Sequence, residues 1–206
     1  MKKTDIILLG GLIGAILFSN FAKFESTLSG LENEVLRMHI LANSDSEEDQ
    51  QLKIKVRNTL LEHSEEIFGN CSTLEEMKNT AEKKLDYIND IVLEVIDENG
   101  FDYNAQSSLV NMEFNDRVYG NLTMPAGNYD ALRITIGEAQ GHNWWCVMYP
   151  PLCIPAAETV SADTDTAEDY FTKEELDVME NPENYQVKFK CAEMFKGIKR
   201  KISDIF

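Results

Sequence analysis

Cys146 and His142 are the two residues whose types and spacing come nearest to a catalytic pair. A thiol becomes a nucleophile when a histidine lies close enough to take its proton. Here a histidine in a predicted turn lies four positions before a cysteine in a predicted strand, so the spacing alone does not ensure contact. A secreted thiol-dependent enzyme that uses Cys146 is one hypothesis for this chain.

Cys153 offers Cys146 a different chemistry. Pro150 and Pro151 lie between the two cysteines and can reverse the chain, which brings the two sulfur atoms within reach. We therefore predict a Cys146–Cys153 disulfide, with two buried free thiols as the alternative. The other two cysteines, Cys71 and Cys191, stay unassigned.

Metal and cofactor chemistry finds little support in the residue pattern. The chain has three histidines, in a predicted strand, a predicted helix and a turn: His39, His63 and His142. No HExxH, CxxC or paired Cys/His spacing accompanies them, so we predict no metal site and no cofactor. Asn43, Asp45 and Asp49 offer oxygen ligands for calcium, but their loop lacks the glycine and the distal glutamate of an EF-hand, and helix capping explains them better.

The leader and the charge limit the class of protein. Lys2 and Lys3 precede an apolar run from Ile6 to Phe18, which predicts a signal peptide or an N-terminal membrane anchor within residues 1–24. Export permits disulfides. No clean cleavage site follows, so cleavage and retention both stay open. The formal net charge of −17 argues against nucleic acid as a partner, because phosphate binding needs a basic surface.

Hydrophobic periodicity predicts an α+β fold, an antiparallel sheet packed by two long helices, plus a C-terminal amphipathic helix. The expected strands are Val35–Ala42, Leu109–Phe114, Val118–Met124, Tyr129–Ile136 and Asn143–Tyr149, and the expected helices run from Ser46 to Phe68 and from Ser72 to Asn99. Ser46 with Asp49, and Ser72 with Glu75, have the spacing of capping boxes. The last two strands are expected to pair as a hairpin.

Alternation gives these strands two distinct faces. In the first strand Arg37 and His39 share a face, opposite Leu36, Met38 and Ile40. In the last strand Trp144 and Trp145 point to opposite faces. Either both faces of the sheet are covered, or one indole is exposed as an interface anchor.

The chain beyond residue 154 changes composition twice. We expect an α+β domain over residues 25–154 and an acidic linker over 155–184, in which Thr172 and Glu175 cap a short helix. Residues 185–206 form a basic amphipathic helix. It either docks on the acidic body or lies on an anionic membrane.

Two blocks of the sequence combine unusual residues. The first comprises Arg37, His39, Ala42–Ser46, Asp49-Gln50, Leu52-Lys53 and Val56-Arg57, and the second comprises Pro125–Gly127, Tyr129, Ala131–Ile134, Ile136-Gly137, Gly141, Asn143–Val147 and Pro150–Cys153. Together these blocks resemble the stage II sporulation protein R family of spore-forming bacteria. The resemblance covers about residues 35 to 155, and NWWCV followed by PPLC is its most specific string.

The resemblance implies a signalling protein that is not itself an enzyme. It implies production in the forespore, export into the septal intermembrane space, and activation of a membrane-embedded aspartic protease in the mother cell, which then cuts a sigma-factor precursor. A structural envelope protein anchored by residues 6–22 is a further alternative. The residues that we predict to contact a partner lie at strand ends and turns: Arg37, His39, Asn43, Asp45, Asp49, Asn143, Trp144, Trp145, Pro150 and Pro151.

Overall fold

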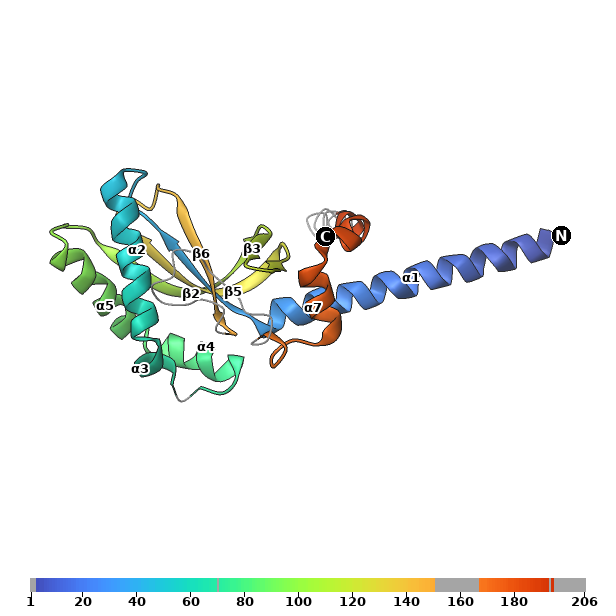
Figure 1. The fold of residues 1–206 in the computed structure, drawn as a ribbon, viewed down its shortest axis with the longest axis horizontal. Helices are drawn as coiled ribbons and strands as arrows, with labels where there is room; N and C mark the ends of the chain where they lie inside the picture. Colours follow the sequence, from blue (N-terminus) through green and yellow to red (C-terminus); the bar gives the residue numbers. More distant parts are fainter. Residues whose placement is uncertain (1–2, 70, 151–166, 193, 195–206) are drawn as a thin grey trace, which may run out of the picture.

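The computed structural model of this chain describes residues 3–69, 71–150, 167–192 and 194 (Figure 1). The helices are α1 (Lys3–Glu34), α2 (Glu47–Glu62), α3 (Ser64–Phe68), α4 (Leu74–Lys83), α5 (Leu85–Glu98) and α7 (Lys173–Glu180), with a 3-10 turn at Pro182–Tyr185. The strands are β1 (Leu36–Leu41), β2 (Ala105–Phe114), β3 (Arg117–Tyr119), β4 (Leu122–Met124), β5 (Gly127–Ile136) and β6 (Asn143–Tyr149).

The predicted α+β class is confirmed, although the sheet is mixed rather than wholly antiparallel. Its strand order is β2-β5-β1-β6, and β1 runs parallel to β5 while the other pairs are antiparallel. The predicted hairpin between the last two strands is wrong, because β1 lies between them. The connection from β5 to β6 crosses the end of β1, where Gln140 and Gly141 donate their backbone N–H groups to the carbonyls of Asn43 and Ala42.

Both faces of the sheet are covered (Figure 1). Helices α2 and α5 pack on one face, where the buried side chains include Leu36, Met38 and Ile40, as the alternation in β1 predicts. The other face is covered by the second half of α1, by α7 and by the β3–β4 hairpin. The predicted strand at 118–124 is in fact this small hairpin.

Each of the two long predicted helices is divided by a break. The first ends at His63 and resumes as α3, and the second breaks at Lys84 between α4 and α5. The cap at Ser46 is confirmed, since its hydroxyl accepts the Asp49 N–H at 3.2 Å. The cap predicted at Ser72 is one residue too early, because Thr73 caps the helix and accepts the Glu76 N–H.

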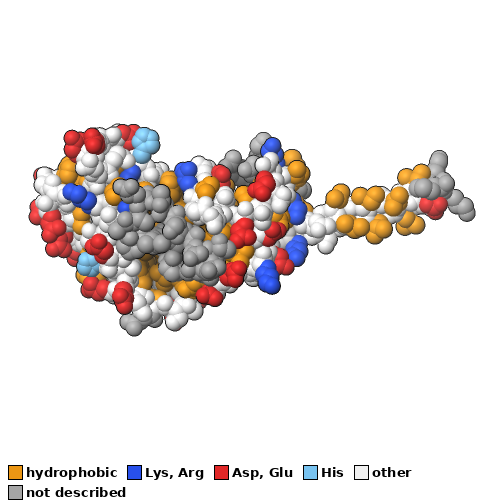
Figure 2. Space-filling view, viewed as in Figure 1, with side chains coloured by type: hydrophobic (Ala, Val, Ile, Leu, Met, Phe, Trp, Pro, Cys, Tyr) orange, Lys and Arg blue, Asp and Glu red, His pale blue; other side chains and the backbone are white. Residues whose placement is uncertain are grey.

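Helix α1 joins the exposed leader to the core without a break. From Ile6 to Phe18 its apolar side chains are exposed, and it is the one helix in the described residues that is long and apolar enough to cross a membrane (Figure 2). From Phe24 onward it enters the protein, and Phe24, Leu28 and Leu31 are buried. Residue 24 is therefore not a structural boundary.

The chain after residue 166 packs against α1 and the second face of the sheet. The capping box of Thr172 and Glu175 is confirmed at the start of α7. Gly30 allows this contact, because a Cβ there would collide with the Glu175 carboxylate. Phe189 and Ala192 then pack against Phe24. The first part of the predicted linker, residues 155–166, and the end of the predicted C-terminal helix, residues 195–206, lie outside the described residues.

Because α1 supplies part of the core, Leu31→Ala should lower the free energy of unfolding by about 2–5 kcal/mol. Leu17→Ala, at a position exposed in the leader, should change it by less than about 0.5 kcal/mol. Urea denaturation of the full chain in mild detergent, followed by tryptophan fluorescence, measures both. Equal losses from the two variants would contradict the role of α1 in the core.

Candidate functional site

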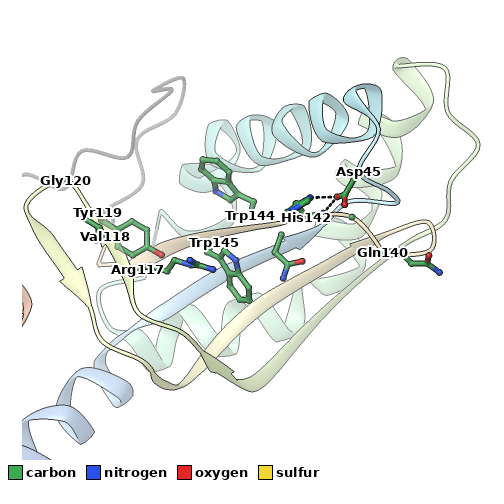
Figure 3. A pocket seen from close by; sticks show the side chains of 11 residues that line it. Asp45, Arg117, Val118, Tyr119, Gly120, Gln140, His142, Trp144 and Trp145 are labelled. Atoms are coloured by element: carbon green, nitrogen blue, oxygen red, sulfur yellow. Dashed lines mark hydrogen bonds and ion pairs between the residues drawn. The ribbon is translucent and has the colours of Figure 1, made fainter. Parts of the chain in front are cut away.

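A groove of about 910 Å³ lies between the start of β6, the turn after β1 and the β3 strand (Figure 3). Three segments far apart in the sequence line it: Asp45; Arg117–Gly120; and Gln140–Trp145. Two indoles, a guanidinium and a carboxylate therefore share one concave surface. Trp, Tyr and Arg are the side chains that most often dominate protein–protein interfaces.

The polar end of the groove is built by two turns that hold each other. The Asp45 carboxylate accepts the backbone N–H of His142 at 2.6 Å and lies 2.5 Å from the His142 Nδ1 (Figure 3). Asn43 bridges the same turns, because its side-chain oxygen accepts the Glu138 N–H at 2.9 Å. Gly137 has a positive φ of 56° and leaves the space that the Asn43 side chain fills.

Hydrogen bonds and burial shift the pKa values of three charged residues at this turn. The two hydrogen bonds from His142 lower the pKa of Asp45, which is exposed. Burial opposes ionisation of Asp49, but hydrogen bonds from Ser44 and Asn43 outweigh it and lower its pKa. Burial also lowers the pKa of Lys53, whose ammonium donates to the His142 carbonyl at 2.9 Å. The Asn43 and Asp45 side-chain oxygens and one Asp49 carboxylate oxygen are thus occupied in joining and bracing the turns.

Arg37 lies on β1, on the sheet face that the β3–β4 hairpin covers, and is fully buried. Its guanidinium lies 4.1 Å from the Phe114 ring centroid and 5.0 Å from that of Tyr129. Its only hydrogen bond among the described residues is the one that Nη2 donates to the Tyr119 hydroxyl at 2.7 Å. Burial lowers the pKa of Arg37, and the nearby Tyr119 opposes the shift.

His39 lies beside Arg37, with 2% of its surface exposed, and stacks on Trp145. The ring centroids are 4.0 Å apart and the planes differ by 5°. Burial and the positive charge of Arg133 lower the pKa of His39 to about 4. The ring is therefore neutral near pH 7, and it holds one wall of the groove by stacking.

The two tryptophans take different supports, and both are half-buried. Trp145 packs edge-on against Phe114 at 4.8 Å, and Arg117 lies 5.7 Å from its centroid. Trp144 points to the opposite face (Figure 3). There the Arg57 guanidinium lies 4.3 Å from its ring centroid. Because both faces of the sheet are covered, each indole packs against protein on one side. The exposed part of each indole lines the groove.

The structure separates the predicted contact residues into three groups. Asp45, Asn143, Trp144 and Trp145 line the groove. Arg37, His39 and Asp49 are buried, and the half-buried Asn43 is held by hydrogen bonds to Asp49 and to the Glu138 N–H, so none of these four lines the groove. Pro150 is buried at the far end of β6, and Pro151 lies outside the described residues.

Arg117 and Tyr119 are groove residues that the sequence did not indicate. They lie in a short hairpin with no recognisable motif, and only the tertiary fold brings it to β6. No group of three or more His, Cys, Asp or Glu side chains able to hold a metal gathers in the described part of the chain.

Cys146 cannot supply a nucleophile in this structure. It is buried and disulfide-bonded, whereas Cys71 and Cys191 are free thiols. Its predicted partner, Cys153, lies outside the described residues. The thiol-enzyme hypothesis therefore loses its central residue, because a bridged sulfur has no thiolate.

Two comparisons of the sequence with known proteins show the family of this chain. Residues 32–159 match the family described as Stage II sporulation protein R (spore_II_R). A relative from Bacillus subtilis (strain 168), named Stage II sporulation protein R, is 35% identical over 160 residues, which cover 74% of this chain and 71% of the relative. This chain belongs to the stage II sporulation protein R family. No solved structure matches it.

Membership in this family confirms the resemblance seen in the sequence and makes the chain a sporulation protein. Every residue of the groove lies within the matched range, from Asp45 to Trp145. Most of α1 and the whole described segment after residue 166 lie outside it.

Thiol labelling tests the state of the cysteines. Two thiols of the unreduced, denatured chain should react with a maleimide, because Cys71 and Cys191 are free. Peptide mass spectrometry should then find Cys146 joined to Cys153. A labelled Cys146 before reduction would contradict the disulfide and restore the nucleophile.

His39 should make the fold sensitive to acid in a defined window. Its folded pKa of about 4 lies below the ordinary 6.5, so the unfolded chain binds more protons between these values, and stability rises with pH across them. From pH 5 to pH 7 the gain from His39 should be about 2 kcal/mol. His39→Phe keeps an aromatic ring against Trp145 but cannot bind a proton. Urea denaturation of this variant at pH 5 and pH 7 should therefore show a rise in the free energy of unfolding that is smaller by this amount. An unchanged rise would show that His39 is not its source.

Proposed function

We propose that this protein is an exported sporulation signal that binds and activates a membrane-embedded aspartic protease, which then processes a sigma-factor precursor. The family supports the role in sporulation. The groove between Arg117 and Trp145 is the observation that carries the binding role, because it gathers interface-type side chains within the family-matched residues.

The N-terminal helix supports export. Lys2 and Lys3 precede the apolar stretch, and basic residues favour the cytoplasmic side, so the protein body would lie outside the cytoplasm. The apolar helix fits a signal peptide or an anchor. In the anchored form one end of the molecule is fixed at a bilayer.

The polar end of the groove, at Asp45 and His142, lies toward the opposite end of the protein. Strand β1 starts directly after α1 and carries the chain about 20 Å away from it before the turn at Asn43 and Asp45. Figure 1 shows this end of β1, beside α2, on the side of the sheet away from the exposed part of α1. A protein anchored in one membrane would thus present the polar end of the groove toward the membrane opposite, which suits a signal passed between two cells across a septum.

Activation would proceed by binding and not by donation of a catalytic group. The catalytic aspartates of the proposed partner would face the cytoplasm of the mother cell, on the other side of its membrane. Binding can raise their activity only if this protein prefers the active conformation or oligomer of the protease. The rigid supports of the two indoles suit such a role, because a preorganised surface loses little entropy on binding.

The experiment is co-expression with the candidate protease and the sigma-factor precursor, with cleavage as the readout. Arg117→Glu should lower cleavage about tenfold or more at limiting protein levels, because Arg117 is exposed at the groove and loss of an interface anchor costs about 2 kcal/mol. Stability should hardly change, since exposed cation–π contacts contribute about 0.5–1 kcal/mol.

Lys83→Glu is the matched control. It makes the same change of charge at an exposed position on α4, away from the groove, and should leave cleavage unchanged. Equal cleavage by the Arg117→Glu and wild-type proteins, at equal folded amounts, would remove the groove from the proposal.

A further inference from the structure

The segment after α7 forms a second surface, at the root of the exposed apolar helix. Residues 186–192 are helical, and in Figure 1 this helix is seen nearly end-on while α1 runs across the view, so the two cross. Tyr185 stacks on Phe24 at 5.5 Å, and Phe189 packs edge-on against the same ring at 5.1 Å. The crossing point is therefore Phe24.

Phe24 lies where α1 would leave a bilayer. At about 1.5 Å per residue, residues 4–22 extend about 28 Å, close to the ~30 Å hydrocarbon core of a membrane. Lys23 follows at once. The crossing helix is then level with the lipid headgroups and runs along the membrane surface rather than through it.

The side chains of this helix form one face packed on α1 and one exposed apolar face, as in helices that lie in a membrane surface. Phe189 and Ala192 face α1, whereas Val187 and Met194, seven residues apart and on one helical face, have 76% and 58% of their surfaces exposed. Lys188 lies beside the apolar junction, with its ammonium 5.5 Å from the Phe24 ring and 4.8 Å from that of Tyr185. Exposed apolar side chains flanked by lysine are typical of helices that lie in a membrane surface.

Charge distinguishes this segment from the rest of the chain. Residues 186–206 carry six lysines and arginines against Glu193 and Asp204, a local net charge of +4 within a chain of −17. Figure 2 shows basic side chains at the root of the apolar helix. An anionic bilayer attracts lysine and repels the acidic body, and the side chains exposed away from α1 give the basic segment a face toward such a bilayer.

We propose that the helix at residues 186–192, together with Met194, rests on an anionic phospholipid surface while the other face of the helix stays docked on α1. Val187 and Met194 would contact the lipid, and Lys188 would lie among the headgroups. This contact is independent of the groove and of any protease. It would fix the tilt of the protein body relative to its membrane, since α1 alone allows rotation and tilt.

The test uses the full chain in nanodiscs. A nitroxide is placed at Val187→Cys in a Cys71→Ser/Cys191→Ser background, and at Lys83→Cys for comparison; Val187 is exposed, so the label leaves the docked face intact. In discs of phosphatidylcholine with phosphatidylglycerol, the label at 187 should be accessible to oxygen and shielded from an aqueous nickel chelate. The label at 83 should be accessible to the chelate.

Charge variants then identify the lipid. Lys188→Gln should lower the equilibrium constant for the immersed state roughly fivefold, the equivalent of about 1 kcal/mol per lysine at an anionic surface. Lys188→Arg and the control Lys83→Gln should leave it unchanged. Two results overturn the proposal: equal aqueous access at 187 and 83, or equal immersion at 187 in pure phosphatidylcholine. Neither affects the cleavage assay of the groove variants, so the two proposals fail separately.

Discussion

The packing of aromatic rings around the buried guanidinium of Arg37 is the interaction on which the second face of the sheet depends. A charge removed from water is costly unless other groups replace its solvation. Among the described residues no carboxylate does so for Arg37. Three aromatic rings from β2, β3 and β5 surround the guanidinium, and one tyrosine hydroxyl accepts from it. A desolvated cation–π contact contributes about 2 kcal/mol, so several of them can offset much of the cost of burial.

This arrangement sets the shape of the groove. Tyr119 can accept from Arg37 only if the β3–β4 hairpin folds back over β1, and that places Arg117 beside Trp145. His39, two residues along the same strand, holds Trp145 by stacking. Arg37 thus positions the hairpin that carries Arg117, and His39 positions Trp145. Both residues shape the groove, although neither of them lines it. Their burial also explains why residues in the family-like sequence blocks need not touch a partner.

The sequence predicted what is local and missed what is long-range. Alternation placed Arg37 and His39 on the face opposite Met38, and cap spacing located α7, because both depend on neighbours along the chain. The parallel pairing of β1 with β5 joins residues almost a hundred positions apart, and the turn before β6 looked like a hairpin turn although it crosses over β1. Arg117 had no local signal at all, and Arg37 was taken for a surface residue because nothing in its own strand shows the hairpin that covers it.

The direct passage from α1 into β1 has a consequence for signalling. Val35, between them, is fully buried, so no flexible linker separates the apolar helix from the centre of the sheet. If residues 4–22 cross a bilayer, the rest of α1 adds about 18 Å and β1 about 20 Å. The groove turn can then stand at most about 38 Å above the membrane that holds the protein. A partner in that same membrane would need an equally tall domain to reach the turn, whereas one in a closely apposed facing membrane needs only short loops. Under the proposed function, this rigidity would present the groove turn of an anchored protein toward the facing membrane.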